Sequence, residues 1–301
     1  MLTAGLIEKW SKSPLAMSGP HRASPGGHEE GEAVLASLGK LEARLARTSA
    51  EVRRAQALRY QVFFEEMSAR PGPLARLLRL DRDRHDRICD HLLVIDRDAP
   101  GSPAVGTYRF LTQDKARRAD MEFYSQGEFD LVPMMARHGA LKFMELGRSC
   151  VLAPWRNSRT IELLWAGTWA HVVASKVDVM IGCASFATTD IEAIREPMSF
   201  LFHHAPACDE WSVSARPGLG VAMDRMPRSQ IDTRRALHAM PPLIKGYLRL
   251  GARFAHEAVI DHHFATTDVL VVLPISAISQ RYIRHYGADA SRHSPVRQLA
   301  L

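Results

Sequence analysis

Two kinds of hydrophobic spacing run along this chain, and each predicts a different element. Between Leu41 and Leu45 apolar residues alternate with charged ones, which is typical of a half-buried strand. Thr48-Ser49-Ala50-Glu51 is typical of a helix start, because the Thr48 hydroxyl and the Glu51 carboxylate satisfy free N–H groups there. Val177 to Phe186 is almost continuously apolar, which indicates a central strand covered on both faces. These patterns predict strands over 38–46, 91–96, 104–111, 142–152, 177–186, 258–264 and 268–273, and helices over 48–67, 161–175, 242–249 and 275–286.

The order of these elements indicates one mixed α/β domain. Residues 12–33 are rich in Ser, Pro, Gly and His and have no hydrophobic period, so we expect a flexible N-terminal arm over 1–33. The domain is expected over 34–290, followed by a C-terminal tail over 291–301. Residues 187–240 carry no clear pattern and are expected to form an insertion or elaboration before the last strands.

Composition and charge exclude several classes of protein. A chain with 46% hydrophobic residues packs a core, and its formal net charge of +6 favours an acidic partner. Its basic residues are scattered among acids without interleaved aromatics, so we expect no nucleic-acid partner. The four cysteines form no ligand cluster, which predicts reduced thiols. No apolar window has the length of a membrane span and no secretory signal is present, so we expect a cytoplasmic protein.

The most informative stretch runs from Glu145 to Thr160, where a predicted strand turns into a helix. Free backbone N–H groups and the positive end of the helix dipole at such a turn favour a phosphate group. Arg156 and Arg159 add charge, and Ser158 and Thr160 add hydroxyl donors, so a phosphopantetheine phosphate fits here. An ordinary connection with solvent-facing arginines is the alternative, and both interpretations stay open at this point.

The element order, with this turn after the fourth strand, resembles the GNAT acyltransferase fold. Residues 247–254 resemble the tract that precedes the last two strands in that superfamily. Many members have glycines in the phosphate turn where this chain has Asn157 and Ser158. The resemblance implies a mixed, mostly antiparallel central sheet flanked by helices, with a helical elaboration before the last strands.

Further tracts carry a narrower resemblance that spans about residues 38–290. They include Arg59-Tyr60-Gln61-Val62-Phe63, Asp81-Arg82-Asp83 with Asp86, Cys89-Asp90-His91-Leu92, Gly106-Thr107-Tyr108-Arg109, Phe123-Tyr124-Ser125 and Glu145-Leu146-Gly147-Arg148. These tracts are similar to the ornithine N-alpha-acyltransferases of bacterial ornithine-lipid synthesis. Their pattern of Arg, Phe, Asp, Arg and Glu-x-x-Arg residues is also similar to that of acyl-homoserine-lactone synthases. Both families imply an acyl carrier protein thioester as the donor.

The resemblance implies transfer of a 3-hydroxyacyl chain to the alpha-amine of L-ornithine, with no metal or redox cofactor. The incoming ammonium must lose a proton. Glu145 is the expected general base, and Arg148 completes the expected catalytic pair.

The other expected roles concern binding. A substrate carboxylate needs a cation and a side-chain ammonium needs an acid. Arg59, Arg109 or Arg148 is expected to bind the carboxylate, although Arg109 is equally a candidate partner of Asp90. Asp86, Asp90 or Asp130 is expected to bind the ammonium. The acidic carrier protein is expected to face a basic rim drawn from Arg76, Arg79, Arg82, Arg84, Arg156 and Arg159, and the acyl chain is expected to face Phe63, Phe64, Phe110, Trp165 and Trp169 unless these are plain core.

Several alternatives stay open. A lactone synthase, an acyltransferase for another amino acid and a non-catalytic sensor of acylated carrier protein share the same expected fold. Because a product with one long chain enters membranes, peripheral contact with the inner membrane stays open beside a purely cytoplasmic location. His203-His204 and Asp261-His262-His263 lack a third ligand at a sensible spacing, so we expect no metal site, and we expect Cys150 to be a packed side chain.

Overall fold

The computed structural model describes residues 34–67 and 69–278 of the chain. The expected arm over 1–33 and the expected tail over 291–301 lie outside these residues and stay predictions. The expected helix over 275–286 lies mostly outside them as well. Its described part contains the 3-10 turn Ile275–Ala277.

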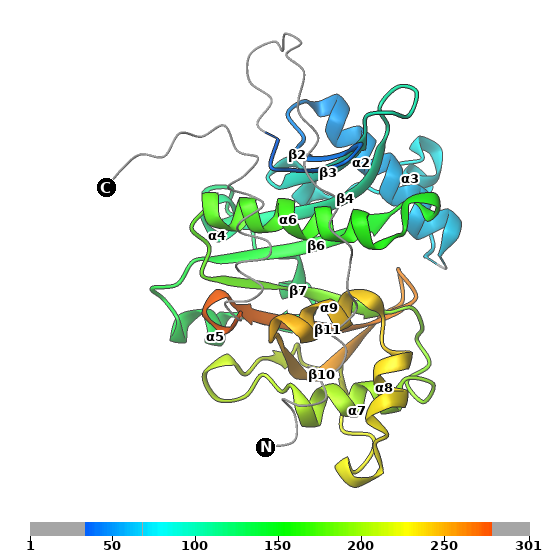
Figure 1. Ribbon diagram of the computed structural model, residues 1–301. Helices are drawn as coiled ribbons and strands as arrows, with labels where there is room; N and C mark the ends of the chain where they lie inside the picture. The colour runs from blue at the N-terminus through cyan, green and yellow to red at the C-terminus, as the bar shows by residue number, and fades with distance from the viewer. Residues whose placement is uncertain (1–33, 68, 279–301) are drawn as a thin grey trace. The chain divides into compact units, whose positions relative to one another are not determined.

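A nine-stranded sheet forms the centre of the described residues (Figure 1). Its strands follow the order β1-β2-β3-β4-β6-β7-β11-β10-β9, and all neighbours are antiparallel except β6 and β7, which are parallel. The strands are β1 (Ala36–Leu38), β2 (Leu41–Leu45), β3 (Asp90–Asp96), β4 (Ala104–Thr112), β6 (Phe143–Val151), β7 (Val179–Phe186), β9 (Gly220–Ala222), β10 (Arg253–Asp261) and β11 (Thr266–Pro274), and β5 (Phe129–Asp130) pairs separately with β8 (Ser214–Ala215). The mixed, mostly antiparallel sheet that the sequence predicts is confirmed.

Helices cover both faces of this sheet because its strands carry two alternating apolar sets. On β3, Leu92 and Val94 belong to the core that includes α6, whereas Leu93 and Ile95 pack against α2. The helices are α2 (Ser49–Tyr60), α3 (Pro73–Leu78), α4 (Gln113–Arg118), α5 (Val132–Arg137), α6 (Ser158–Ala174), α7 (Arg195–His204), α8 (Thr233–Ala239) and α9 (Pro242–Leu250). Figure 1 shows α6 and α9 in front of the sheet, where they cover its two halves.

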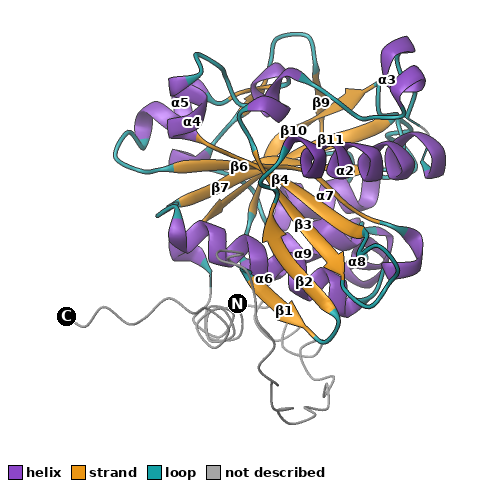
Figure 2. Cartoon of the chain, turned by 90° about the horizontal axis from the view of Figure 1, so that it is seen from above, coloured by secondary structure: helices purple, strands orange, loops and turns teal. Residues whose placement is uncertain are grey.

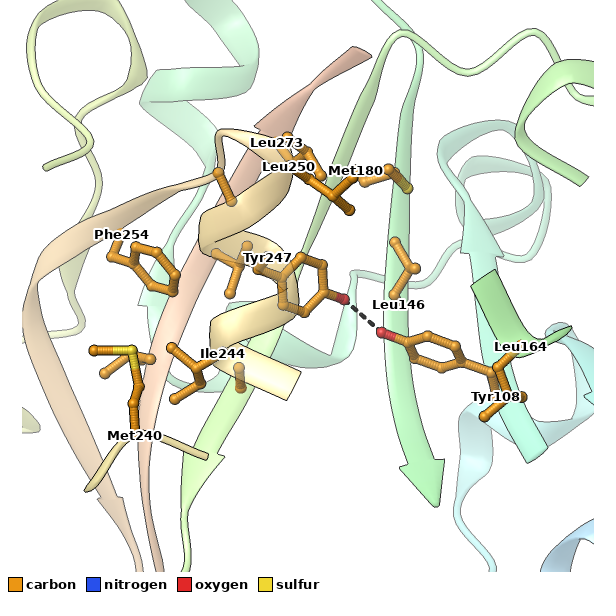
Figure 3. Packing of buried hydrophobic residues seen from close by; sticks show 14 of the residues in the cluster. Tyr108, Leu146, Leu164, Met180, Met240, Ile244, Tyr247, Leu250, Phe254 and Leu273 are labelled. Carbon is orange, nitrogen blue, oxygen red and sulfur yellow. Dashed lines mark hydrogen bonds between the residues drawn. The ribbon is translucent and has the colours of Figure 1, made fainter. Parts of the chain in front are cut away.

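The core beneath α6 and α9 is continuous across the sheet. Tyr108 on β4 and Tyr247 on α9 share a hydrogen bond between their hydroxyl groups (Figure 3). The Trp165 ring of α6 meets the Tyr247 ring edge-on, with 5.4 Å between the ring centroids. These contacts join α9 to the half of the sheet that carries α6, and the polar hydroxyls are satisfied inside an apolar core.

The predicted start of α2 is confirmed. The Thr48 hydroxyl accepts a hydrogen bond from the Glu51 N–H at 3.2 Å, and the Glu51 carboxylate accepts one from the Arg47 N–H at 2.8 Å. The helix then continues as the π-helix Gln61–Glu66, which accounts for the predicted helical length to about residue 67.

Two predicted strands are corrected by the structure. The predicted strand 38–46 is a hairpin of β1 and β2, because Gly39 adopts a φ of 62° that allows a tight turn. The predicted strand 258–264 begins earlier, at Arg253, because a register shift between Phe254 and Ala258 interrupts the alternation by which strands are detected. Residues 187–240 form the predicted helical elaboration with α7 and α8, and also supply the short edge strand β9, which the sequence did not predict.

Candidate active site

The parallel strands β6 and β7 separate after a short stretch of pairing. They pair from Phe143 to Glu145, opposite Val179 to Ile181. Beyond that point Tyr108 of β4 lies opposite two residues of β6, Arg148 and Ser149, which is a β-bulge. Arg148 accordingly has a left-handed φ of 57°. The bulge bends β6 away from β7 and opens a wedge between them.

A glycine keeps the two strands in contact at the narrow end of this wedge. A Cβ on Gly182 of β7 would lie 2.2 Å from the Leu146 carbonyl oxygen of β6, closer than any side chain tolerates. The bare backbone therefore permits the close approach from which the strands diverge.

A cavity of about 340 Å³ occupies the wedge. Its walls come from β6, β7 and β11, from the π-helix after α2, and from the turn between β10 and β11. Its polar and aromatic lining includes Glu145, Arg148, Ser185, Asp261, Phe264 and Asp268. The cavity thus brings a cation and several acids together in one concave site, as expected of a small-molecule site.

Glu145, the expected general base, lies where β6 and β7 begin to separate, and its carboxylate already accepts hydrogen bonds within the protein. It accepts hydrogen bonds from the N–H groups of Tyr124 and Ser125, each at 2.7 Å, and another from the Ser125 hydroxyl. A carboxylate has about four lone-pair positions, so one remains for a substrate proton. Glu145 therefore holds the loop at 124–125 in addition to lining the cavity.

Arg148 does not pair with Glu145. Its guanidinium lies 4.5 Å from the Tyr124 ring centroid and 4.6 Å from that of Phe264. Its Nε lies 3.2 Å from Asp81 Oδ2. Burial acts to lower the pKa of Arg148, yet attraction to Asp81 and Tyr124 outweighs burial and raises it. The bulge, the ring contacts and this ion pair hold a permanently charged group against the cavity.

Arg148 belongs to a network of three arginines and three aspartates, which we call the arginine–aspartate cluster. Its members are Arg59, Asp81, Asp83, Asp86, Arg109 and Arg148. Arg59 is fully buried, with its Nε 2.8 Å from Asp81 Oδ2 and its Nη2 2.9 Å from Asp86 Oδ2. Arg109 Nη1 lies 2.9 Å from Asp86 Oδ1. Burial acts to raise the pKa of Asp86, but the charges of Arg59 and Arg109 outweigh burial and hold it well below its usual range.

This cluster corrects two expected binding roles. Arg59 and Asp86 have no place among the cavity-lining residues, and each forms ion pairs with charged partners inside the cluster. Arg109 lines the cavity but pairs with Asp83 and Asp86 rather than with Asp90. The cluster is a charge-balanced support for the cavity wall.

The remaining two candidate acids for the ammonium also lie away from the cavity lining. Asp90 pairs with Lys115 at 2.5 Å and with His171 at 3.4 Å, and Asp130 is exposed on β5. The expected ammonium site is therefore not formed by these two residues.

A second group of acids, which the sequence analysis missed, does face the cavity. Asp261 and Asp268 line it, and Glu128 lies behind Asp268, with the ligand atoms of Glu128, Cys183 and Asp268 all within 4.8 Å of one another. Burial next to Asp268 raises the pKa of Glu128 to about 8, and burial also raises the pKa of Asp268. We call Glu128, Asp261 and Asp268 the acid wall.

The acid wall lies next to a cysteine thiol. Cys183 donates its S–H to Glu128 Oε2 at 3.3 Å, and burial raises the pKa of the Cys183 thiol well above its usual range. The wall lacked a sequence signal because Glu128 is distant in sequence from Asp261 and Asp268, and only strand register brings Asp268 next to Ser185 of β7.

The start of α6 differs in part from the predicted phosphate turn. Asn157 caps the helix, since its Oδ1 accepts a hydrogen bond from the Thr160 N–H at 3.1 Å. Thr160 is fully buried and directs its hydroxyl to Asn157, so its expected role as a phosphate donor is corrected. Ser158 and Arg159 are exposed. Arg156 lines the cavity, donates from Nε to the Val151 carbonyl at 2.8 Å and pairs with Glu66.

The aromatic candidates divide between the cavity and the core. Phe63 lines the cavity, whereas Phe110 is fully buried in the core that α6 covers. Trp165 and Trp169 pack against that same core. Phe64 packs on Phe264, with 5.9 Å between ring centroids, and so supports a cavity wall.

A family model and several curated proteins match the sequence of this chain. The family model described as "Acetyltransferase (GNAT) domain" matches residues 58–166, from the end of α2 to the middle of α6. The L-ornithine N(alpha)-acyltransferase of Agrobacterium fabrum is 51% identical over 88% of this chain and 91% of its own length. That of Rhizobium meliloti is 51% identical over 87% of this chain and 89% of its own length. The chain therefore belongs to the L-ornithine N(alpha)-acyltransferase family, which confirms the resemblance seen in its sequence.

Among solved structures, the AHL synthase LasI is 10% identical to this chain. It covers 86% of this chain and 98% of its own, with a TM-score of 0.42. In the part of the chain that the structure describes, no helix has the length and apolar character needed to cross a bilayer.

Proposed function

We propose that this chain transfers a 3-hydroxyacyl group from acyl carrier protein to the alpha-amine of L-ornithine and so forms lyso-ornithine lipid. The observation that carries the acceptor is 51% identity, over 88% of the chain, to a protein named for that reaction. The amine nitrogen bonds to the thioester carbon, the carbon–sulfur bond breaks, and the thiol leaves with a proton. This direct transfer requires no metal or redox cofactor.

The wedge between β6 and β7 is our candidate binding site for the extended phosphopantetheine arm of the donor. Beyond Glu145, β6 pairs with β4 but no longer with β7, so one edge of its backbone is open to the amides of an extended ligand. Backbone N–H groups from Gly147 to Cys150 are our candidates for stabilising the developing oxyanion. Arg156, whose side chain is 46% exposed beside the cavity, is our candidate for the donor phosphate, and the exposed Ser158 and Arg159 continue that surface.

The two charged sides of the cavity fit a diamino acid. Arg148 faces the cavity with donors that its aspartate partners leave unused, since a guanidinium has five N–H groups. We assign the ornithine carboxylate to Arg148 and the side-chain ammonium to Asp268 with its acid-wall neighbours. An amino acid without the second ammonium leaves these buried acids without a counter-charge, which provides selectivity.

Glu145 remains our candidate for the general base. It lines the cavity at the head of the wedge, and one lone-pair position is free to take the alpha-ammonium proton directly or through a water molecule. Its hydrogen bonds to 124–125 fix the carboxylate in place, which favours a defined angle of attack.

Release of free thiol from 3-hydroxyacyl carrier protein tests this function. We expect release with ornithine and at least about tenfold less with 2-aminopentanoic acid, which lacks the second ammonium. Glu145→Gln should lower the maximal rate about 100-fold, as loss of a general base does, while Glu122→Gln, at an exposed glutamate, should not.

Other outcomes identify the alternatives. Release with S-adenosylmethionine but not with ornithine would indicate a lactone synthase, and release with a different amino acid would indicate another acceptor. Retained binding of acylated carrier protein, without release for any acceptor, would indicate a sensor.

A further inference from the structure

The short helix α3 presents apolar side chains to the outside. The exposed fractions of Leu74, Leu77 and Leu78 are 62%, 79% and 45%. Figures 1 and 2 show α3 at the outer edge of the described residues, away from the centre of the sheet. Three neighbouring exposed leucines on one short helix are unusual for a surface in contact with water alone.

Basic side chains surround these leucines. In the α3 segment, residues 70–87, all six arginines are exposed: Arg70, Arg76, Arg79, Arg82, Arg84 and Arg87. Arg79 pairs with Glu65, and none of the other five forms an ion pair with a described carboxylate.

The acids of the same segment are directed inward. Asp81 and Asp86 are buried, and Asp83 is half-buried. All three are paired with Arg59, Arg109 or Arg148 of the arginine–aspartate cluster. The cluster therefore neutralises the acids of the segment from behind, and its outer side is left cationic and apolar together.

The α3 segment begins at the rim of the cavity. Met67 and Ala69 line the cavity directly before the segment. The Arg70 N–H donates to the His263 carbonyl at 3.0 Å, next to Phe264 in the opposite rim. The first residue of the α3 segment therefore lies next to residues that line the cavity.

We propose that the α3 segment is a docking surface for an anionic lipid bilayer. Leu74, Leu77 and Leu78 enter the boundary between headgroups and acyl chains, and the surrounding arginines bind anionic headgroups. Charge alone would suit an acidic protein as well, including the carrier protein that the sequence assigned to Arg76, Arg79, Arg82 and Arg84. The projecting leucines favour the bilayer, because they match its apolar interior. Delivery of a single-chain product from the cavity to the bilayer rests on the proposed function, whereas docking itself does not.

Co-sedimentation with vesicles tests the surface in the full chain. We expect binding to vesicles of phosphatidylglycerol and phosphatidylcholine that weakens with added salt, and at least about tenfold weaker binding to phosphatidylcholine alone. The triple variant Leu74→Ser, Leu77→Ser, Leu78→Ser should lower the affinity about tenfold or more. The matched control is Val132→Ser, Val173→Ser, Leu219→Ser, at sites 59%, 60% and 43% exposed outside the α3 segment, which should change the affinity less than about twofold.

The readouts separate docking from catalysis. None of the six substituted positions lines the cavity, so thiol release in lipid-free solution should be unchanged in both triple variants and reports whether they are folded. Equal vesicle binding by the leucine variant and the wild type, or no binding by the wild type, would overturn the proposal. Unchanged vesicle binding with weakened carrier-protein affinity would overturn it in favour of a protein-docking surface.

Discussion

Two groups of buried charges support the same cavity, and they differ in balance. The arginine–aspartate cluster places three arginines against three aspartates, so its charges cancel within the protein. The acid wall has Glu128 and Asp268 next to the Cys183 thiol, with Asp261 in the same cavity lining, and burial raises the pKa of Glu128 and Asp268. A balanced group stabilises a fold, whereas an unbalanced one favours a ligand of opposite charge. The comparison predicts that substitutions in the arginine–aspartate cluster lower the stability of the fold. Substitutions in the acid wall are expected to lower the affinity for the substrate.

The largest expected effect comes from unbalancing the cluster. Arg59→Ala leaves Asp81 and Asp86 buried without their main cation, which should lower the free energy of unfolding by about 3–5 kcal/mol. Urea denaturation followed by circular dichroism measures this loss.

The same helix offers a matched control for that change. Arg53 is exposed on α2, and Arg53→Ala should change the free energy of unfolding by less than about 0.5 kcal/mol. If both variants unfolded at the same urea concentration, the cluster would not be the structural support that its geometry indicates.

The next effect in size comes from the acid wall. Asp268→Asn removes the cavity-lining charge assigned to the substrate ammonium, so KM for ornithine should rise about 10- to 100-fold, the loss of one charge-assisted contact. Stability should be preserved or slightly raised, because a repulsion between buried acids is removed. Steady-state kinetics and urea denaturation of the same sample measure both quantities.

Asp130→Asn is the control for this charge change, since Asp130 is exposed on β5. A loss of stability in Asp268→Asn with an unchanged KM would reverse the comparison and make the wall a structural feature.

Sequence reasoning predicted the strands of the site better than the partners of its side chains. The strand that carries Glu145 and Arg148 was predicted because an apolar strand is a local pattern, and both residues line the cavity, while their catalytic roles stay predictions. Arg59 and Asp86 were expected at the substrate and instead pair with each other, since a sequence gives residue types without their distances. The acid wall was not predicted at all, because Asp268 meets Cys183 and Glu128 only through the β7–β11 register and the loop before β5.

The smallest expected effect is a pH dependence that separates the two groups. In the folded protein burial raises the pKa of Glu128 from its ordinary 4.5 to about 8. Its contribution to stability is fully present below pH 4.5 and is lost as pH rises through about 8, because the folded state must then bear a buried charge. Binding of the ornithine cation requires that charge, so KM for ornithine should fall about three- to tenfold between about pH 6.5 and 8.5. Glu128→Gln, measured at each pH beside the wild type, should remove the part of this slope that Glu128 contributes. The titration of ornithine itself is common to both proteins and cancels in the comparison. An identical slope in the two proteins would separate Glu128 from substrate binding and leave Asp268 and Asp261 as the ammonium site.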